Sequence, residues 1–437
     1  MNSGHTQSNR YANGGALIVR AARFKFVAAA ILVFLFTANI YDPSGAFRIK
    51  HVAFFLACLF SFWTLQYADL SVREIAAGLV LFLAWPTWSL LYGAARGGIL
   101  PIGLSQVTPF LFLWLLASLL PYFDKQTPLR IFYACIFSLA VFVIVSFGLV
   151  FLWPNSSISG AVYDLLVSLH GREGYFGTRS WGDVDVPIFY FGSTLFLVPT
   201  CVYYLFIGKM LRAGAVFLAI ALTWSKAGIL IVLAFGVIYF ATSLVAHPFL
   251  RLTGGAPMKR QRLFRILAPL ILLAVISSSI LISFPQFLDY VRYTVAGESE
   301  TSLVRIGHYH SVLGLFARSP HYLLVGQGAG VPFFTSGESE YVNSIELDYL
   351  DAIRKFGLPW FLGFSLVVFL SAWRLIKTEH IETRAFGFAL ISMYVAAGTN
   401  PVLLTPLFIM LMTLSYFSQR FVHERSSSHP VGDLQRI

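Results

Sequence analysis

The chain has 437 residues, of which 57% are apolar and only 12% are charged. A water-soluble protein of this length could not cover its surface with so few polar side chains, so the composition excludes an ordinary soluble enzyme. The net charge is +11, but the basic residues are spread over many segments rather than gathered in one, and no nucleic-acid partner is expected.

Roughly a dozen stretches almost lack charged residues, as membrane spans do, because an unpaired charge in hydrocarbon costs several kcal/mol. They do not alternate polar and apolar residues, so they predict helices. The expected fold class is an all-α polytopic membrane protein. Its 12 expected transmembrane helices cover residues 25–41, 51–67, 75–93, 104–122, 131–153, 187–207, 213–223, 227–246, 266–284, 358–373, 385–398 and 402–417.

The basic residues orient these spans, because cytoplasmic loops carry an excess of Lys and Arg. With both termini cytoplasmic, the inner segments hold 20 of the 31 Lys and Arg, and the outer segments hold 13 of the 20 Asp and Glu. The first apolar run lacks a small-residue cleavage site, which predicts an uncleaved first span. The expected organisation is a cytoplasmic tail (1–24), one transmembrane domain (25–419) with extracytoplasmic loops at 154–186 and 285–357, and a cytoplasmic tail (420–437).

The first long loop contains the sequence HGREGYFGTRSWGDVDVP. Arg172 and Arg179 among glycines and aromatic residues suit an anionic or sugar ligand, because guanidinium groups pair with phosphate. A purely structural loop is the alternative. Asp183 and Asp185 are spaced like an acidic metal-binding pair, but a solvated turn is the favoured interpretation and no metal site is expected.

Lys226 lies between two apolar runs in ALTWSKAGILIVLAF. A short outer turn there would hold the ammonium group at the membrane interface, facing the outer loops. A cation within a membrane domain indicates a functional site by default, and snorkelling to lipid headgroups is the alternative.

The second long loop has helical patterns of its own. TSLVRIGHYHSVLGLF (301–316) predicts a helix that ends before Pro320, and GQGAG (326–330) predicts a flexible turn. EYVNSIELDYLDAIRKF (340–356) predicts a second helix with Gly357 as its C-cap.

On the second predicted helix, Glu346 lies within an apolar stripe. A helical turn of 100° per residue brings four apolar residues within about 60° of it: Val342, Tyr349, Leu350 and Ile353. Desolvation there would raise the pKa of Glu346 toward the range of a general base, whereas a structural Glu–Arg pair is an equally weighted alternative. The remaining charged residues predict a solvated face: Asp348, Asp351, Arg354 and Lys355.

On the first predicted helix, Arg305 shares a face with apolar residues, within about 40° of Tyr309, Val312 and Phe316. A guanidinium on a packed face needs a carboxylate or a phosphate. His308 and His310 lie close by, and a structural or merely exposed histidine is the favoured interpretation for both.

These segments resemble the O-antigen polymerase and O-antigen ligase superfamily of bacterial membrane glycosyltransferases. LTWSK (222–226) resembles the family's "LT-x-SR" turn. The segment SLVRIGHYHSVLGLFARSPHYLLVGQGAG resembles its "R…F…PL-x-G-x-G" loop, and the segment IELDYLDAIRKFGL resembles the helix that precedes its next span. The resemblance covers roughly residues 170–370. Two departures exist: Lys226 replaces an arginine, and Ile345-Glu346 replaces the His-Asn pair of the ligases, which favours a polysaccharide polymerase.

The resemblance implies a GT-C-like architecture in the bacterial inner membrane and metal-independent, inverting glycosyl transfer from an undecaprenyl-diphosphate-linked oligosaccharide, without a cofactor. Glu346 is then the base, Arg305 the catalytic cation at the leaving diphosphate, and further contacts to diphosphate or substrate come from Lys226, Arg172, Arg179, His308 and His310. The implied partners are the lipid-linked donor and acceptor, membrane lipids, a chain-length regulator and a flippase.

Two other functions remain open. A ligase that transfers the glycan to a lipid A core or another acceptor would use the same donor site. A lipid-linked oligosaccharide flippase is disfavoured, because it would need a polar cavity through the bilayer, and the predicted spans are nearly free of charge.

Overall fold

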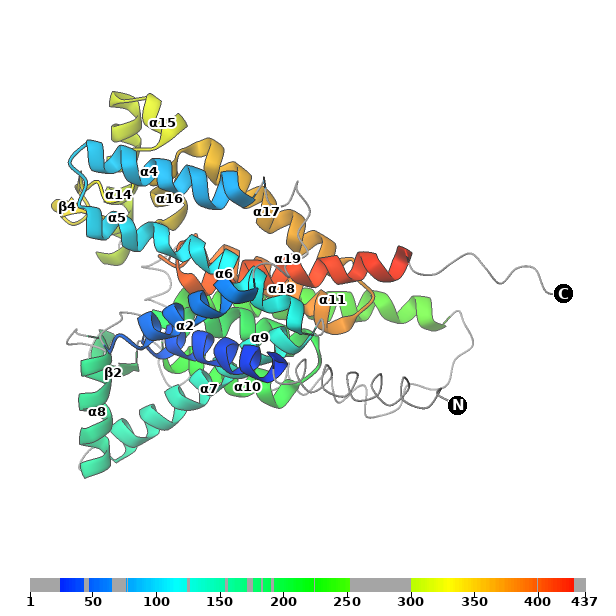
Figure 1. The fold of residues 1–437 in the computed structure, drawn as a ribbon. Coiled ribbons are helices and arrows are strands. Elements are labelled where there is room, and N and C mark those ends of the chain that lie inside the picture. Colours follow the sequence, from blue (N-terminus) through cyan, green and yellow to red (C-terminus); the bar gives the residue numbers. More distant parts are fainter. Residues whose placement is uncertain are drawn as a thin grey trace, which may run out of the picture.

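The computed structural model describes twelve parts of the chain: residues 24–42, 47–64, 76, 78–123, 126–153, 156–170, 176–181, 184–189, 192–223, 225–251, 300–398 and 400–427. These parts are almost entirely helical, with two short antiparallel hairpins (Figure 1). The predicted span 266–284 lies outside the described residues, so it stays a prediction.

The described part of the chain begins with a helix over Phe24–Tyr41. The α-helices that follow are α2 (Ile49–Thr64), α4 (Trp85–Ala95), α5 (Leu100–Val107), α6 (Leu111–Leu119), α7 (Thr127–Phe147), α8 (Ser157–His170), α9 (Leu197–Phe206), α10 (Met210–Leu222), α11 (Lys226–Arg251), α14 (Glu300–Arg318), α15 (His321–Val325), α16 (Asp348–Phe356), α17 (Leu358–Ile376), α18 (Ile381–Ala397) and α19 (Pro406–Ser427). Shorter π and 3₁₀ turns are η2 (Val80–Ala84), η3 (Thr108–Phe110), η4 (Leu120–Tyr122), η5 (Gly148–Leu152) and η6 (Gly192–Phe196). The strands are β1 (Phe176–Trp181), β2 (Val184–Phe189), β3 (Phe333–Thr335) and β4 (Glu340–Val342).

Four helices among the described residues are long and apolar enough to cross a membrane: Phe24–Tyr41, Leu100–Tyr122, Thr127–Val150 and Leu358–Ile376. Several others are apolar but only 10–17 residues long. The protein is therefore an all-α protein with the helices of a multi-pass membrane protein. The expected number of twelve spans is wrong for the described chain, which has four helices of spanning length.

A short helix and a strand explain part of this difference. Where one span was expected at 75–93, η2 continues into α4 as one helix over Val80–Ala95, which is shorter than the four spanning helices. Where another was expected at 187–207, the chain first forms strand β2, and helical structure starts only at Gly192. The strand therefore occupies the first residues of that expected span.

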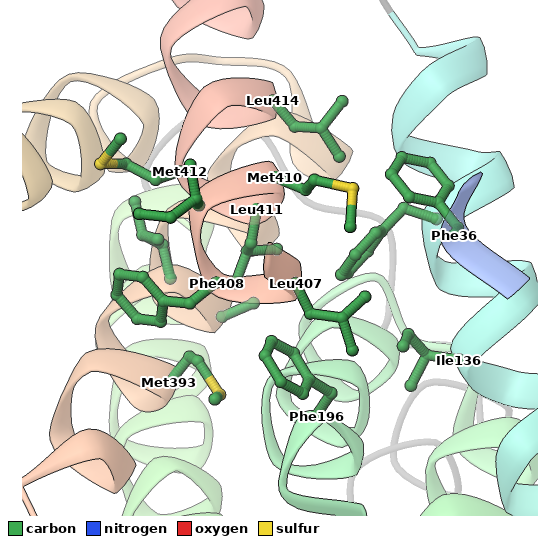
Figure 2. Close-up of a cluster of buried hydrophobic side chains, with 14 of the residues drawn as sticks. Phe36, Ile136, Phe196, Met393, Leu407, Phe408, Met410, Leu411, Met412 and Leu414 are labelled. Atoms are coloured by element: carbon green, nitrogen blue, oxygen red, sulfur yellow. The ribbon is translucent and has the colours of Figure 1, made fainter. Parts of the chain in front are cut away.

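The core of the bundle is centred on α19, which packs against α6, α17 and α18. Figure 2 shows its side chains surrounded by residues of other helices that are distant in sequence. The labelled residues of α19 are Leu407, Phe408, Met410, Leu411, Met412 and Leu414, and the labelled residues around them are Phe36, Ile136, Phe196 and Met393. Close packing of this kind holds helices together in a bilayer, where lipid is as apolar as the side chains.

The described elements of the two predicted long loops gather at one end of the bundle. In Figure 1, α8, β2, α14, α15, α16 and β4 all lie at the left, whereas α19 extends to the right. The two segments that contain these elements are the two predicted long loops. Their common position at one end is what a shared membrane side requires.

Candidate functional site

Helix α14 forms where the sequence predicts it and ends at Arg318, just before Pro320. Its most deeply buried side chains are His308 and Val312, both fully buried. Val312 packs with a small apolar cluster from the β3–β4 hairpin and the segment after it: Phe333, Val342 and Ile345. Tyr309, expected on the packed face, is 45% exposed, so the buried side of α14 is centred on His308 and not on Arg305.

The predicted second helix over 340–356 is wrong in its first half. Residues Glu340–Val342 form strand β4, paired with β3 so that Phe333 lies opposite Val342, and α16 begins only at Asp348. The backbone carbonyl of Asn343 is bound by side chains, which occupies a group that a helix would use internally. Gly357 ends α16 at φ 87°, as predicted.

Arg305 and Glu346 meet across the gap between α14 and the segment before α16. The Arg305 Nε donates to Glu346 Oε2 at 2.9 Å, and its Nη2 lies 2.9 Å from the same oxygen. The two side chains are 34% and 46% exposed, respectively. Glu346 therefore does not lie in a buried apolar stripe on a helix, as expected; it is half exposed and bound to the arginine.

His308 is bound on one side only. Its Nε2 lies 3.1 Å from Glu338 Oε1, while Nδ1 has no partner among the described residues. Glu338 belongs to the turn between β3 and β4, and that turn approaches α14 so closely that a Cβ on Gly307 would collide with the backbone of Gly337. His308 thus attaches the hairpin to α14. His310 lies exposed on the other side of the helix.

The charged residues of α16 are buried, which contradicts the predicted solvated face. The Arg354 side chain is fully buried and its guanidinium is saturated with hydrogen bonds. It donates to Asp351 Oδ1 (3.0 and 2.7 Å), Gln327 Oε1 (2.9 Å), and the carbonyls of Val331 and Asn343 (both 3.0 Å). The α16 helix is enclosed by α4, α14, α15 and α17, so both its faces are covered.

The burial of α16 shifts the pKa values of its other charged groups. Burial alone would raise the pKa of Asp351, but Lys355 and Arg354 beside it hold that pKa below its usual value. Burial lowers the pKa of Lys355, against the effect of Asp351. Burial also raises the pKa of Asp348 to about 7, although the backbone N–H of Leu403 donates to its carboxylate. Such buried charges are stable only when paired and hydrogen-bonded.

The glycine turn, residues 326–330, joins α16 to the helices α4 and α5. Ala329 N donates to Ser89 Oγ at 3.0 Å, and Ser89 Oγ donates to the Lys355 carbonyl at 2.8 Å. Gly330 N donates to Gln106 Oε1 at 2.9 Å. Gly328, at φ 105°, lies directly against the backbone of Gly93. The turn predicted as flexible is therefore fixed by hydrogen bonds to two helices.

The other predicted site residues lie elsewhere. Lys226 is the first residue of α11, which is capped by Ser225 Oγ accepting from Gly228 N at 3.2 Å, and α11 packs against α9 and α18 rather than α14. Arg179 lies in strand β1 opposite Val186. Arg172 lies outside the described residues. The described contacts bring together Arg305 and Glu346, and they do not join Lys226 to this pair.

Sequence reasoning missed the buried network around Arg354. A signal for it existed: Asp348 and Asp351 stand in the first turn of α16, and Arg354 and Lys355 in its last turn, as the helix dipole favours. That distribution marks the true start of the helix at Asp348, not at 340.

In comparisons with known proteins, no protein-family model and no curated protein sequence matched this chain.

Proposed function

We propose that the protein is a bacterial inner-membrane glycosyltransferase that polymerises undecaprenyl-diphosphate-linked oligosaccharide repeat units on the outer face of the membrane. The observation that carries the proposal is the contact between Arg305 and Glu346, a cation and a carboxylate that remain partly accessible outside the spans. One group suits a diphosphate leaving group and the other suits a proton on an attacking hydroxyl. The proposal builds on the resemblance of the surrounding segments to O-antigen polymerases.

Rigid attachment of the pair to the membrane domain supports this function. Arg354 ties α16 to the glycine turn, and Ser89 ties that turn to α4. Gly357 leads directly from α16 into the spanning helix α17. A site on such a support stays at a constant height above the bilayer, where the diphosphate of a polyprenyl lipid is located. Positioning of this kind supplies a large part of the rate in transfer reactions.

In the proposed reaction, a hydroxyl oxygen of the acceptor repeat unit attacks the anomeric carbon of the lipid-linked chain. The bond from that carbon to the diphosphate oxygen breaks, and the electron pair leaves with the diphosphate. Arg305 binds the developing negative charge, and Glu346 takes the hydroxyl proton. A single displacement of this kind inverts the configuration at the anomeric carbon.

Because the two residues are paired, the donor diphosphate has to bind before Glu346 can accept the proton. Glu346 is bound to Arg305, so an arriving diphosphate has to replace the carboxylate on the guanidinium. A displaced carboxylate no longer shares its oxygens with the guanidinium, so it can accept a hydrogen bond from the acceptor hydroxyl. Donor binding thereby prepares Glu346 to accept the proton.

The test of the function is the lipid-linked material that accumulates when the gene is deleted in its bacterial host. A polymerase predicts single repeat units on outward-facing undecaprenyl diphosphate, and their conversion to polymer when the wild-type gene is restored. Complete lipid-linked polymer would instead identify a ligase. Repeat units confined to the cytoplasmic leaflet would identify a flippase, and either result would overturn the proposal.

A further inference from the structure

Helix α8 begins at the end of a membrane-spanning helix. The span Thr127–Val150 ends in the π turn η5, and Ser156 N donates to the Trp153 carbonyl at 3.2 Å, so the two described segments meet here. Ser156 then caps α8, because its Oγ accepts from Ser159 N at 3.0 Å. Because Ser156 is bound directly to Trp153 at the end of the span, α8 has to start at the surface of the bilayer.

Helix α8 also has the direction of a helix that lies along a surface. In Figure 1 it runs across the long helices of the bundle, at the same end as β2 and α14. Its 14 residues span about 21 Å at 1.5 Å per residue. A helix that starts at the bilayer surface and runs crosswise to the spans stays near that surface along its length.

The faces of α8 differ in chemistry. Ser159 is buried and Val162 packs against the core, which defines the side facing the protein. Beside it, Ile158 is 61% exposed and Leu165 is 48% exposed, and the two lie within about 20° of each other on a helical wheel. Asp164 lies about 100–120° away from them. An apolar stripe next to a polar face is the pattern of an interfacial helix.

We propose that α8 is an in-plane interfacial helix whose Ile158 and Leu165 insert among the lipids of the outer leaflet. The occupant is lipid because α8 directly follows a spanning helix that itself presents apolar side chains outward: Val141 and Val145 of α7 are 43% and 51% exposed. Trp153, which is 70% exposed at the junction, is the residue type that anchors proteins at the membrane–water interface.

One consequence concerns the β1–β2 hairpin, which follows α8 in the chain and carries Arg179 in β1. An interfacial α8 keeps the start of this hairpin at headgroup height. The inference rests on the membrane-spanning character of α7 and not on the proposed glycosyl transfer, so the two can fail independently.

The test uses the full-length protein in liposomes of phosphatidylethanolamine and phosphatidylglycerol. The three cysteines, Cys58, Cys135 and Cys201, are replaced by alanine, and single nitroxide labels are introduced. Ile158→Cys and Leu165→Cys report the apolar stripe. Ser157→Cys and Asp164→Cys are the matched controls, with the same seven-residue spacing on the polar side, and Val141→Cys within α7 is the lipid reference. Collisions with oxygen and with a water-soluble nickel chelate are measured for each label.

Interfacial α8 predicts a severalfold higher ratio of oxygen to nickel accessibility at positions 158 and 165 than at 157 and 164, at a depth of about 5–10 Å below the phosphates. High nickel accessibility at all four positions would place α8 in water and overturn the inference. Low accessibility of 158 and 165 to both reagents would mean that protein covers the stripe, for example a second copy of the chain, and would overturn it equally.

Discussion

The Arg305 guanidinium and the Glu346 carboxylate lie 2.9 Å apart although 41 positions of sequence separate them. Both side chains are partly exposed, and ion pairs in such positions contribute only about 0–1 kcal/mol to stability. Removing either partner should therefore leave the fold intact. This contrasts with the fully buried Arg354, whose contacts hold the same loop together. Substitution of Arg305 should leave the stability of the fold nearly unchanged, whereas substitution of Arg354 should lower it.

Substitution of Arg354 should destabilise the protein. Arg354→Met leaves Gln327 Oε1 and the carbonyl of Val331 without their Arg354 donor, and the carbonyl of Asn343 keeps only its bond from Gln106. Loss of one partner from a buried charge network costs about 3–5 kcal/mol. The matched control is Arg318→Met on the exposed end of α14, which should change stability by no more than about 0.5 kcal/mol. Melting temperatures in detergent measure both, and equal melting of the two variants would contradict the role of Arg354.

The contact between the glycine turn and α4 should be sensitive to a single methyl group. In Gly93→Ala, the new Cβ collides with the carbonyl oxygen of Ala329, and overpacking against backbone costs about 1–3 kcal/mol. Gly236→Ala in α11 is the control, because a Cβ there meets nothing within 4 Å. The control should melt at or above the wild-type temperature, since alanine favours helix. A Gly93→Ala protein that melts like the control would show that the close approach does not exist.

Stability should fall as the pH rises through the range in which Asp348 ionises. Burial raises the pKa of Asp348 to about 7 in the folded protein from 3.8 in an exposed carboxyl. The folded state therefore holds this proton while the unfolded state has released it, and stability is lost between about pH 4 and pH 7. Each tenfold difference in proton affinity corresponds to about 1.4 kcal/mol.

The variant Asp348→Asn isolates this effect, because asparagine stays neutral and keeps an oxygen for the Leu403 N–H. Melting temperatures from pH 5 to pH 7.5 should fall less steeply for the variant than for the wild type. Identical slopes would show that Asp348 does not titrate in this range.

The membrane orientation can be tested across one helix. Tyr341 in β4 and Glu379 after α17 lie on opposite sides of the span Leu358–Ile376, and both are exposed. In the cysteine-free background, Tyr341→Cys should react with an impermeant maleimide added outside intact spheroplasts, whereas Glu379→Cys should react only after the membrane is opened. The reverse pattern would place the Arg305–Glu346 pair on the cytoplasmic side.

Local patterns in the sequence predicted part of this site. The periodicity of α14, its end before Pro320 and the Gly357 cap depend on neighbours within a few residues, and all three are present. The hypotheses that Arg305 needs an anionic partner and that Glu346 pairs with an arginine also agree with the structure. A helical wheel correctly identifies which residues share a face when the helix bounds are right.

The features of the site that the sequence did not predict depend on contacts between residues that are distant in the chain. The first three residues of the predicted helix over 340–356 pair as β4 with β3, and Val342 joins the apolar cluster that includes Val312 of α14. A helical wheel also cannot show which faces of a helix are buried by other parts of the protein. Since α4 and the glycine turn enclose the charged side of α16, Asp351 and Arg354 are buried where the pattern favoured water. The predicted number of spanning helices was wrong for a similar reason: an apolar run can form only a short helix, as at Val80–Ala95, or begin as a strand, as at β2.

The central claim is that Arg305 and Glu346 form a reactive pair rather than a structural one. The most direct measurement compares polymerisation rate and melting temperature for purified protein in liposomes with lipid-linked repeat units. Four proteins are compared: wild type, Arg305→Lys, Glu346→Gln, and the charge swap Arg305→Glu with Glu346→Arg. A control, Glu340→Gln, changes an exposed acid of β4.

If the pair is reactive, the three variants of the pair and the control should all melt near the wild-type temperature. The control should keep the wild-type polymerisation rate, whereas Arg305→Lys and Glu346→Gln should each lose an order of magnitude or more in rate. The swap should remain equally slow, because it restores the ion pair but moves the cation and the carboxylate away from the atoms that need them. Restored polymerisation in the swap, or polymerisation at the wild-type rate by Arg305→Lys or Glu346→Gln, would contradict the reactive role of the pair.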